Sequence, residues 1–369
     1  MSNTIYMTNM ASYLPENVIY NDDLAKIVDT SDEWISSRTG IKQRHICGED
    51  QDSSDLAVMA AKKLVDCGMD PENIDAIVVA TTTSNRMPSA ACRVQYEIGA
   101  KNAFAFDISA ACSGFIYGTY VAKSFMSSSG SVKNVLLISS EAMSQFVDWS
   151  DRSTCVLFGD GSSAVLFQKS NVCGDNQGCT RLEVIDTMIK SMSDKNMYEA
   201  ILIDCKKRNN HVLSSDGFGL EKQGDDIEIV LADGDVCTIS SNNTFGSRNV
   251  LSNEFIVMNG NYVFKNAVDT MSKAINDILS ANGLTINDVD WIVPHQANKR
   301  IIDAMCKFFD FNINKFVCTV DIHANTSAAS IPLAIGHAID NKFFKKGEVV
   351  VTVAFGAGFT YGASIMKVV

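Results

Sequence analysis

The sequence lacks the features that would place it in a membrane, outside a cell or on a nucleic acid. It has no uninterrupted apolar run of about 18 or more residues, the length that a membrane-spanning helix needs. Its first residues, MSNTIYMTNM, show no basic stretch followed by a long apolar segment, so no secretory signal is expected. The net charge of −12 argues against a general nucleic-acid binder, which would present positive charge to phosphates. We expect a soluble, globular, cytoplasmic protein, with a plastid-type compartment as the alternative.

Zinc-type cysteine pairs are also missing, although cysteine itself is abundant. The chain has 11 cysteines in 369 residues, but no C-x-x-C motif and no Cys/His spacing that fits a zinc site. Free thiols in a reducing compartment are therefore expected rather than disulfides. With 46% apolar residues, the chain can bury a large core, either as two domains or as one fused double domain.

One cysteine, Cys112, stands where a strand is predicted to pass into a helix. The apolar run 104–108 predicts a buried strand, a small-residue turn follows, and the apolar spacing after Cys112 predicts a helix. Unpaired backbone N–H groups and the helix dipole favour a thiolate at such a position. We therefore expect a depressed thiol pKa and a nucleophile. The alternative is a small buried hydrophobic residue, the usual environment of a free cysteine.

The segment TSDEWISSRTGIKQRH gathers basic groups around one aromatic ring. Its first threonine or serine can cap a helix that has acidic residues in its first turn. Trp34 is followed by Arg38, Lys42 and Arg44. One interpretation is a planar ligand stacked by Trp34 and Arg38, with phosphates held by the other cations. The other is a solvated amphipathic face.

The two ends of the chain repeat one pattern. At a constant offset, Gly68 aligns with Gly283 and Asp75 with Asp290, and VLLISSEA in the first part corresponds to VVVTVAFG near the C-terminus. Such self-similarity predicts an internal duplication, here of two long units rather than a solenoid. Two βα-rich halves related by a pseudo-twofold axis are expected.

This pattern divides the chain into three parts. Residues 1–170 form the first half, which holds Cys112, and residues 256–369 form the second half. Between them, residues 171–255 are polar, rich in Asn, Gly and Ser, and weakly periodic, which predicts loops and edge hairpins. We expect a variable middle region of surface β structure, whose role the pattern does not indicate.

The duplication predicts that three side chains meet. Cys112 follows a strand of the first half, Asn325 follows the matching strand of the second half, and His295 follows the strand that mirrors residues 76–80. Ligands of open α/β sheets bind at the carboxyl ends of strands, so a Cys/His/Asn site is expected there. Taken singly, His295 could be a satisfied core histidine and Asn325 a turn residue or helix cap.

Eight motifs in order make the chain similar to the β-ketoacyl-acyl-carrier-protein synthase III family, initiating condensing enzymes of the thiolase superfamily. They are TSDEWISSRTGIKQRH, PSAACRVQ, DISAACSGF, DRSTCVLFGDGSSAV, MNGNYVFK, VPHQANKRII, HANTSAASIP and AFGAGFTYG. The resemblance implies an α/β fold, the doubled α-β-α-β-α thiolase sandwich, and a homodimer. It also implies decarboxylative condensation of a short acyl-CoA, with acetyl-CoA expected, with malonyl-acyl-carrier protein. No metal or redox cofactor would be needed.

The same resemblance assigns roles to residues of this chain. Cys112, His295 and Asn325 would be catalytic, and the backbone N–H groups of Cys112 and Ala357 would face the thioester oxygen. Coenzyme A would contact residues from both halves: Trp34, Arg38, Arg152, Phe264, Ala297 and Asn298. Because the carrier protein is expected to be acidic, a local basic patch should dock it, and the candidates beside the VFK and HQAN motifs are Lys265, Arg300 and Lys307.

The chain departs from the family pattern in three places, one of which is Ala357, where glycine is also common. The middle region is expected to be longer than usual, and Met87 stands where an aromatic residue often borders the primer pocket of the partner subunit. Met87 could instead be core packing. The alternatives to an initiating synthase are a related condensing enzyme that uses other acyl primers in secondary metabolism, and a non-catalytic structural partner. A biosynthetic thiolase is disfavoured because AFGAGFTYG contains no second cysteine.

Overall fold

Buried strands and amphipathic helices alternate at both ends of the chain, as their apolar spacing predicts. The computed structural model describes residues 4–84, 86–170, 180–203 and 255–369, together with three strands between residues 219 and 239. By internal contacts the chain divides into two units, Met1–Leu202 with Ile256–Val369, and Ile203–Phe255. Both βα-rich halves therefore belong to one unit.

A nine-stranded sheet forms the frame of the first unit, with the strand order β14-β15-β16-β8-β1-β7-β6-β4-β5. Its strands from the first half are β1 (Ile5–Tyr13), β4 (Ala76–Ala80), β5 (Phe104–Ile108), β6 (Asn134–Ala142) and β7 (Asp160–Lys169). The others are β8 (Leu182–Ser191), β14 (Trp291–Pro294), β15 (Val349–Gly356) and β16 (Thr360–Val368). The two sets join through a short pairing, Tyr6 with Glu183 and Met7 with Leu182. The sheet is therefore two half-sheets with a narrow connection.

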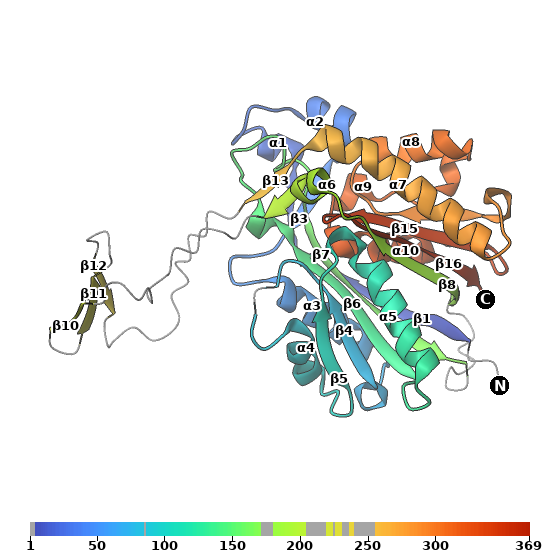
Figure 1. Ribbon diagram of the computed structural model, residues 1–369, viewed down its shortest axis with the longest axis horizontal. Helices are drawn as coiled ribbons and strands as arrows, with labels where there is room; N and C mark the ends of the chain where they lie inside the picture. Colours follow the sequence, from blue (N-terminus) through green and yellow to red (C-terminus); the bar gives the residue numbers. More distant parts are fainter. Residues whose placement is uncertain are drawn as a thin grey trace. The chain divides into compact units, whose positions relative to one another are not determined.

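Helices cover both half-sheets and also fill the space between them (Figure 1). The outer helices of the first half are α3 (Ser53–Asp66) and α4 (Ala90–Ile98), and those of the second half are α7 (Gly260–Ala281) and α8 (Lys299–Phe309). The central helices are α5 (Gly114–Ser128) and α10 (Ser330–Asp340). In the central cluster, Phe115 of α5 and Ile335 of α10 pack with strand residues of both halves, such as Val78 and Val350.

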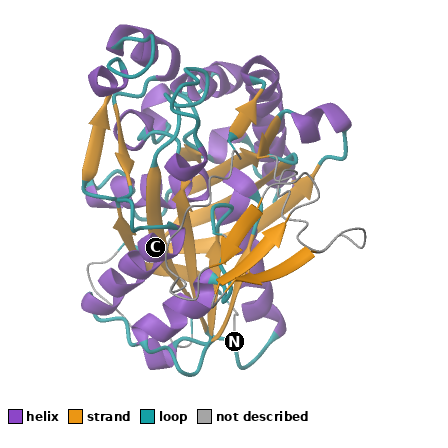
Figure 2. Cartoon of the chain, turned by 90° about the vertical axis from the view of Figure 1, so that its left-hand side faces the viewer, coloured by secondary structure: helices purple, strands orange, loops and turns teal. Residues whose placement is uncertain are grey.

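Alternation along the strands divides the core into layers. Val78 of β4 faces the central helices, whereas its neighbours Ile77 and Val79 pack against α3 and α4. In β15, Val350 faces the centre and Val351 packs against α7 and α8. Because successive side chains of a strand point to opposite faces, each half-sheet is buried on both sides. The predicted α-β-α-β-α order of layers is present, with helices lying outside the strands in the second view as well (Figure 2).

The predicted duplication has structural counterparts along the chain. The order α3-β4-α4 of the first half corresponds to α7-β14-α8 of the second. A 3-10 turn followed by a central helix occurs in both halves, η2 (Ala111–Ser113) before α5 and η6 (Ser327–Ala329) before α10. Each half then continues into an antiparallel strand pair, β6 with β7 and β15 with β16.

One predicted strand is absent from the described residues. The counterpart of β5 is a single bridge between Ile292 and Phe316, and the chain then enters the short helix α9 (Val320–His323). The side chain of Gln296 explains the difference. Its amide donates to the Val317 carbonyl (3.1 Å) and its oxygen accepts from the Thr319 N–H (2.8 Å). The Gln296 side chain therefore bonds the backbone groups that a neighbouring strand would otherwise pair with. Asn325 therefore follows a helix rather than a strand.

The remaining elements are short. In the first unit they are β2 (Asn17–Tyr20), α1 (Asn21–Leu24), α2 (Asp32–Thr39), β3 (Gln43–Ile46), α6 (Lys195–Glu199) and a pairing of β9 (Ile201–Ile203) with β13 (Ile256–Met258). The second unit contains an antiparallel sheet of β10 (Gly219–Gln223), β11 (Asp226–Val230) and β12 (Val236–Ile239). The expected loops NVCGDNQGC, KKRNNH and SSNNTFGSRN lie outside the described residues.

Candidate active site

Cys112 lies at the predicted junction of strand and helix. β5 ends at Ile108, the turn Ala111–Ser113 contains Cys112, and α5 begins at Gly114. The residue is only partly buried, whereas Cys47 and Cys155 are buried in the core.

The turn around Cys112 is fastened to the loop before β16. The Ser113 hydroxyl donates to the Thr360 carbonyl (2.9 Å), and the Thr360 hydroxyl donates to the Ala110 carbonyl (2.9 Å). Ala111 has a positive φ of 46°. Such a backbone conformation costs on the order of 1–3 kcal/mol for a residue with a side chain, so surrounding contacts must hold it.

Gly356, at the end of β15, lies directly against the backbone of this turn. A Cβ on Gly356 would be 2.8 Å from the Cys112 nitrogen and 3.1 Å from the Ser113 nitrogen, a separation that no side chain tolerates. Ala357, the predicted second oxyanion donor, follows immediately, and its carbonyl accepts the Thr360 hydroxyl (3.3 Å). The loop therefore runs beside the Cys112 N–H, as a site with two backbone donors requires.

His295 follows β14 directly and is buried, with 3% of its surface exposed. Its Nδ1 lies 2.7 Å from the Ser330 hydroxyl, which also accepts a hydrogen bond from the Gln296 N–H (3.3 Å). Burial lowers the pKa of His295 to about 3, so the ring is neutral near pH 7. With Nδ1 occupied, Nε2 is the ring nitrogen left for a substrate.

Asn325 is buried in the loop between α9 and η6. Its Oδ1 accepts the backbone N–H of Ser327 (2.9 Å), which directs the amide donor of the side chain away from Ser327. Two residues close to Asn325 in the chain have positive φ, 56° at Ala324 and 49° at Ser327. The turn η6 packs against the turn that holds Cys112. Ser327 and Ser330, one turn apart, thus connect Asn325 and His295 to the neighbourhood of Cys112.

The thiol of Cys112 differs from the prediction. Burial raises the pKa of Cys112 to about 12; a hydrogen bond from Ser327 opposes this shift and the Glu141 carboxylate adds to it. The predicted depressed pKa is therefore wrong, because desolvation outweighs the effect of the helix N-terminus in the substrate-free protein. Cys112 rests as a thiol.

Sequence analysis missed three residues of this site: Glu141, Ser327 and Ser330. Glu141 is fully buried, and its carboxylate accepts a hydrogen bond from the Ser327 hydroxyl (3.1 Å). A signal was present, since Glu141 is an acidic residue within the apolar strand VLLISSEA. The two serines belong to HANTSAAS, but nothing in that motif indicates which of them face neighbouring side chains.

Three of the predicted coenzyme A contacts form one cluster. Trp34 lies between two guanidinium groups, with the Arg38 and Arg152 Cζ atoms each 4.6 Å from its ring centroid. Arg152 also donates to the Asp29 carbonyl (2.7 Å). The predicted helix is confirmed as α2, capped by Ser31, whose hydroxyl accepts from the Trp34 N–H. A planar ligand stacked on Trp34 would displace one guanidinium, which could then meet a phosphate.

Arg44 does not join this cluster, contrary to the expected grouping of cations. It is fully buried and bonds to the Asn21 side chain (2.9 Å) and the Val156 carbonyl (3.1 Å). Burial lowers the pKa of Arg44 to about 10. Successive side chains of β3 point to opposite faces of the strand, and the Arg44 side chain is on the face that points into the core.

The other predicted coenzyme A contacts lie around the start of α8. Phe264 and Ala297 are partly buried in the cluster between α7 and α8, and Asn298 caps α8 by accepting the Arg300 N–H (2.8 Å). α8 also touches the end of α2, since a Cβ on Gly40 would lie 2.5 Å from the Lys299 Cβ. The two groups of predicted contacts are therefore neighbours.

The predicted docking residues Lys265, Arg300 and Lys307 are all exposed on α7 and α8. Arg300 lies over the ring of Phe264, 5.5 Å from its centroid. Lys299, beside them, is already paired with Asp303 (2.7 Å). The three cations thus lie on the two helices that also carry Phe264 and Asn298.

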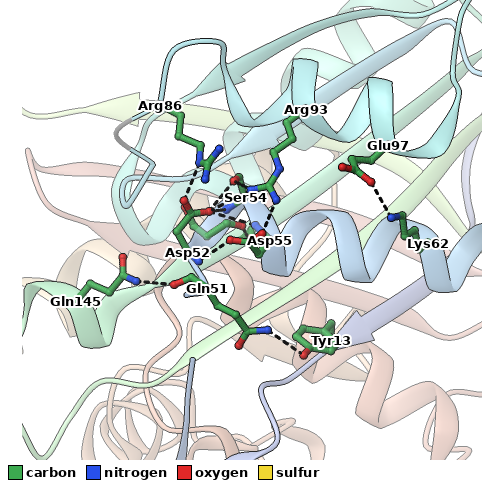
Figure 3. A network of polar contacts seen from close by, with 12 residues as sticks. Tyr13, Gln51, Asp52, Ser54, Asp55, Lys62, Arg86, Arg93, Glu97 and Gln145 are labelled. Carbon is green, nitrogen blue, oxygen red and sulfur yellow. Dashed lines mark hydrogen bonds and ion pairs between the residues drawn. The ribbon is translucent and has the colours of Figure 1, made fainter. Parts of the chain in front are cut away.

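Met87 is 99% exposed, so it is not core packing within its own chain. Polar contacts anchor the loop that carries it (Figure 3). Arg86 pairs with Asp52, the cap of α3 (2.7 Å), and Arg93 of α4 pairs with Asp55 of α3. Met87 therefore projects from a braced loop.

Comparison with known proteins assigns this architecture to the thiolase-type condensing enzymes. The model of the 3-oxoacyl-[acyl-carrier-protein (ACP)] synthase III family matches residues 106–191, and its C-terminal model matches residues 279–368. A beta-ketoacyl-[acyl-carrier-protein] synthase III from Wolbachia pipientis wMel is 42% identical over 366 residues, 99% of both chains. The chain belongs to the β-ketoacyl-acyl-carrier-protein synthase III family and is a condensing enzyme of the acyltransferase type.

Solved structures agree with this assignment. The 3-oxoacyl-[acyl-carrier-protein] synthase III from Aquifex aeolicus VF5 is 36% identical, with a TM-score of 0.78 and 99% of each chain covered. A priming beta-ketosynthase of a polyketide pathway is 27% identical, with a TM-score of 0.78 over 98% of this chain and 96% of its own. The predicted thiolase-like fold is confirmed. The Wolbachia relative has about the length of this chain, so a long middle region is not peculiar to it.

The described residues contain no group of three or more His, Cys, Asp or Glu side chains placed to hold a metal ion. Their helices include none with the length and apolar content of a membrane span.

Proposed function

We propose that this chain condenses a short acyl-CoA, with acetyl-CoA as the expected primer, with malonyl-acyl-carrier protein to give 3-oxoacyl-carrier protein and so initiates fatty acid biosynthesis. The observation that carries the proposal is the pairing of a partly exposed Cys112 with two fixed donors, His295 and Asn325. Family membership supports the reaction class. The chain should convert acetyl-CoA and malonyl-carrier protein into carbon dioxide, coenzyme A and 3-oxobutanoyl-carrier protein; failure to consume malonyl-carrier protein with any acyl-CoA would contradict it.

In the first half-reaction, the Cys112 sulfur attacks the thioester carbon of the acyl-CoA. The thiol proton leaves, coenzyme A departs as its thiol, and an acyl-Cys112 remains. The tetrahedral oxygen is stabilised by the backbone N–H groups of Cys112 and Ala357. Because Cys112 rests as a thiol, its proton must be removed as the bond forms.

In the second half-reaction, malonyl-carrier protein loses carbon dioxide and its thioester becomes an enolate. A neutral His295 donates from Nε2, and Asn325 donates from its side-chain amide, to the enolate oxygen. The Ser330 hydroxyl accepts from the Gln296 N–H, and donation of its own proton to Nδ1 would select this tautomer. The enolate carbon then attacks the acyl carbon of acyl-Cys112, the carbon–sulfur bond breaks, and Cys112 takes up a proton as 3-oxoacyl-carrier protein forms. Each step uses side chains and backbone groups of the chain, so the proposal requires no metal or redox cofactor.

Primer choice separates this function from a condensing enzyme of secondary metabolism. The relatives named beta-ketoacyl-[acyl-carrier-protein] synthase III that are 38–42% identical over nearly the full chain favour the initiating synthase. A screen of acyl-CoA primers for acylation of the protein separates the two. A non-catalytic partner would take up no acyl group.

We propose a homodimer as the functional state. β5 lies at the edge of the sheet, and its Phe104 is 45% exposed while stacking on Phe106. An edge strand with unpaired backbone groups and exposed aromatic side chains favours pairing with a second copy. Met87 would then reach the acyl pocket of the partner. The relatives compared come from bacteria, which supports a cytoplasmic location.

Met87→Phe is expected to lower turnover with four-carbon primers more than with acetyl-CoA. Methionine fills a pocket flexibly, whereas a phenylalanine ring forms a rigid wall. The ratio of the two kcat/KM values should change by roughly 10-fold, the effect of about one methylene. Met59→Phe on the exposed face of α3 is the matched control. An unchanged ratio would remove Met87 from primer selection.

Arg300→Glu is expected to raise the KM for malonyl-carrier protein by roughly 10-fold while leaving acyl-CoA acylation of Cys112 nearly unchanged. The reversed charge at position 300 places a negative side chain opposite the acidic carrier protein, and the two repel each other. Lys346→Glu is the matched control, because Lys346 is exposed before β15, at the end of the sheet opposite His295. Equal losses in both half-reactions would indicate a different docking face.

A further inference from the structure

A buried carboxylate that none of the steps above uses lies next to the catalytic groups. Glu141 is 0% exposed, and burial raises its pKa, while hydrogen bonds oppose that shift. A buried carboxylate is expensive unless hydrogen bonds satisfy it, so its presence in a strand of otherwise apolar residues needs an explanation.

Three threonines after β4 surround one side of this carboxylate. The Thr83 hydroxyl donates at 2.6 Å, the Thr82 hydroxyl at 3.0 Å and the Thr81 hydroxyl at 3.3 Å. The backbone N–H of Thr82 donates at 3.1 Å. These donors fix the carboxylate group in one position.

The remaining contact of Glu141 leads to the catalytic groups. The Ser327 hydroxyl donates to Oε1 (3.1 Å), and the backbone N–H of the same serine donates to the Oδ1 of Asn325 (2.9 Å). Ser327 also has a positive φ of 49° and therefore needs contacts that keep it in place. One rigid carboxylate thus holds the residue that fixes the Asn325 side chain, in a turn that packs against the turn of Cys112.

We propose that Glu141 is a positioning residue that acts through Ser327 to orient the Asn325 carboxamide. It holds the Asn325 donor where the enolate oxygen forms. The same carboxyl group lies close enough to Cys112 to disfavour its thiolate and raise its pKa, so Glu141 has opposite effects on the two catalytic groups.

Glu141→Gln should therefore change two measurements in opposite directions. The rate of Cys112 alkylation by iodoacetamide should rise roughly tenfold near pH 8, with the pH profile shifted downward by about one unit. Decarboxylation of malonyl-carrier protein should fall roughly tenfold or more, the effect of one hydrogen bond to a charged group. The alkylation readout does not depend on the proposed function, whereas the decarboxylation readout rests on it.

Asp160→Asn is the matched control. Asp160 is a second fully buried carboxylate, on the neighbouring strand β7, held by the Cys47 N–H (2.8 Å) and by the N–H and hydroxyl of Ser144. Its neutralisation should leave the Cys112 alkylation profile unchanged. The same shift in both variants would mean that any lost buried carboxylate loosens the fold, and would overturn the proposal.

Ser327→Ala tests whether Glu141 acts through Ser327. It also replaces Glu141→Gln as the test variant if Glu141→Gln does not fold. Loss of the Ser327 hydroxyl should slow decarboxylation, as Glu141→Gln does, but should not shift the alkylation profile of Cys112 downward, because the Glu141 carboxyl group remains. In the double variant, decarboxylation should be no slower than in Ser327→Ala alone. Additive losses, or a downward alkylation shift in Ser327→Ala, would contradict positioning through Ser327.

Discussion

Replacing Cys112 by serine is expected to abolish condensation, by a factor of at least about a thousand. A serine hydroxyl is far less ionised than a thiol and is a weaker nucleophile without a dedicated base. The His295 imidazole is neutral with Nδ1 held by Ser330, and the proposal assigns it to the second half-reaction. Acyl-enzyme formation should therefore be undetectable with any acyl-CoA.

Decarboxylation of malonyl-carrier protein should survive in Cys112→Ser, since His295 and Asn325 remain. This retained activity shows that the variant is folded and still docks the carrier protein. Substantial condensation by the variant would remove Cys112 from the role of nucleophile.

His295→Ala and Asn325→Ala are expected to produce the converse pattern. Each removes one donor to the enolate oxygen, so decarboxylation should fall by roughly 10²- to 10³-fold. Acylation of Cys112 should persist, because the proposed oxyanion donors of that step are backbone N–H groups. The readouts are carbon dioxide release and incorporation of a radiolabelled acyl group, measured on the same protein.

His337→Ala is the control for the histidine variant. His337 lies on α10, and its ring contacts Phe343, away from Ser330. It should leave both half-reactions unchanged. Loss of acylation together with decarboxylation in His295→Ala would mean that His295 also serves the first half-reaction, contrary to the division proposed here.

Local patterns predicted most of the frame of the site. The apolar run 104–108, the small turn and the spacing after Cys112 correspond to β5, η2 and α5. Internal similarity placed His295 after β14, because Gly68 and Gly283 end equivalent helices before equivalent strands. These features depend on residues that are close in the sequence or that recur at a constant offset, and both relations can be read from the sequence alone.

What the sequence did not predict depends on residues far apart in the chain. The missing counterpart of β5 results from the side chain of Gln296 occupying the ladder positions of Val317 and Thr319. Arg44 belongs to a basic cluster by spacing, yet strand alternation turns it into the core. Burial, not the position at a helix start, decides the pKa of Cys112. How deeply each of these side chains is buried is decided only when the helix and strand layers pack together.

The measurement that tests the central claim most directly is the location and fate of the acyl group. The protein would be incubated with radiolabelled acetyl-CoA, divided, and one part digested for peptide mapping while the other is chased with malonyl-carrier protein. The account predicts a thioester on the peptide that contains Cys112, and transfer of that label to 3-oxobutanoyl-carrier protein during the chase. Label on a different residue, or label on Cys112 that malonyl-carrier protein does not remove, would contradict it.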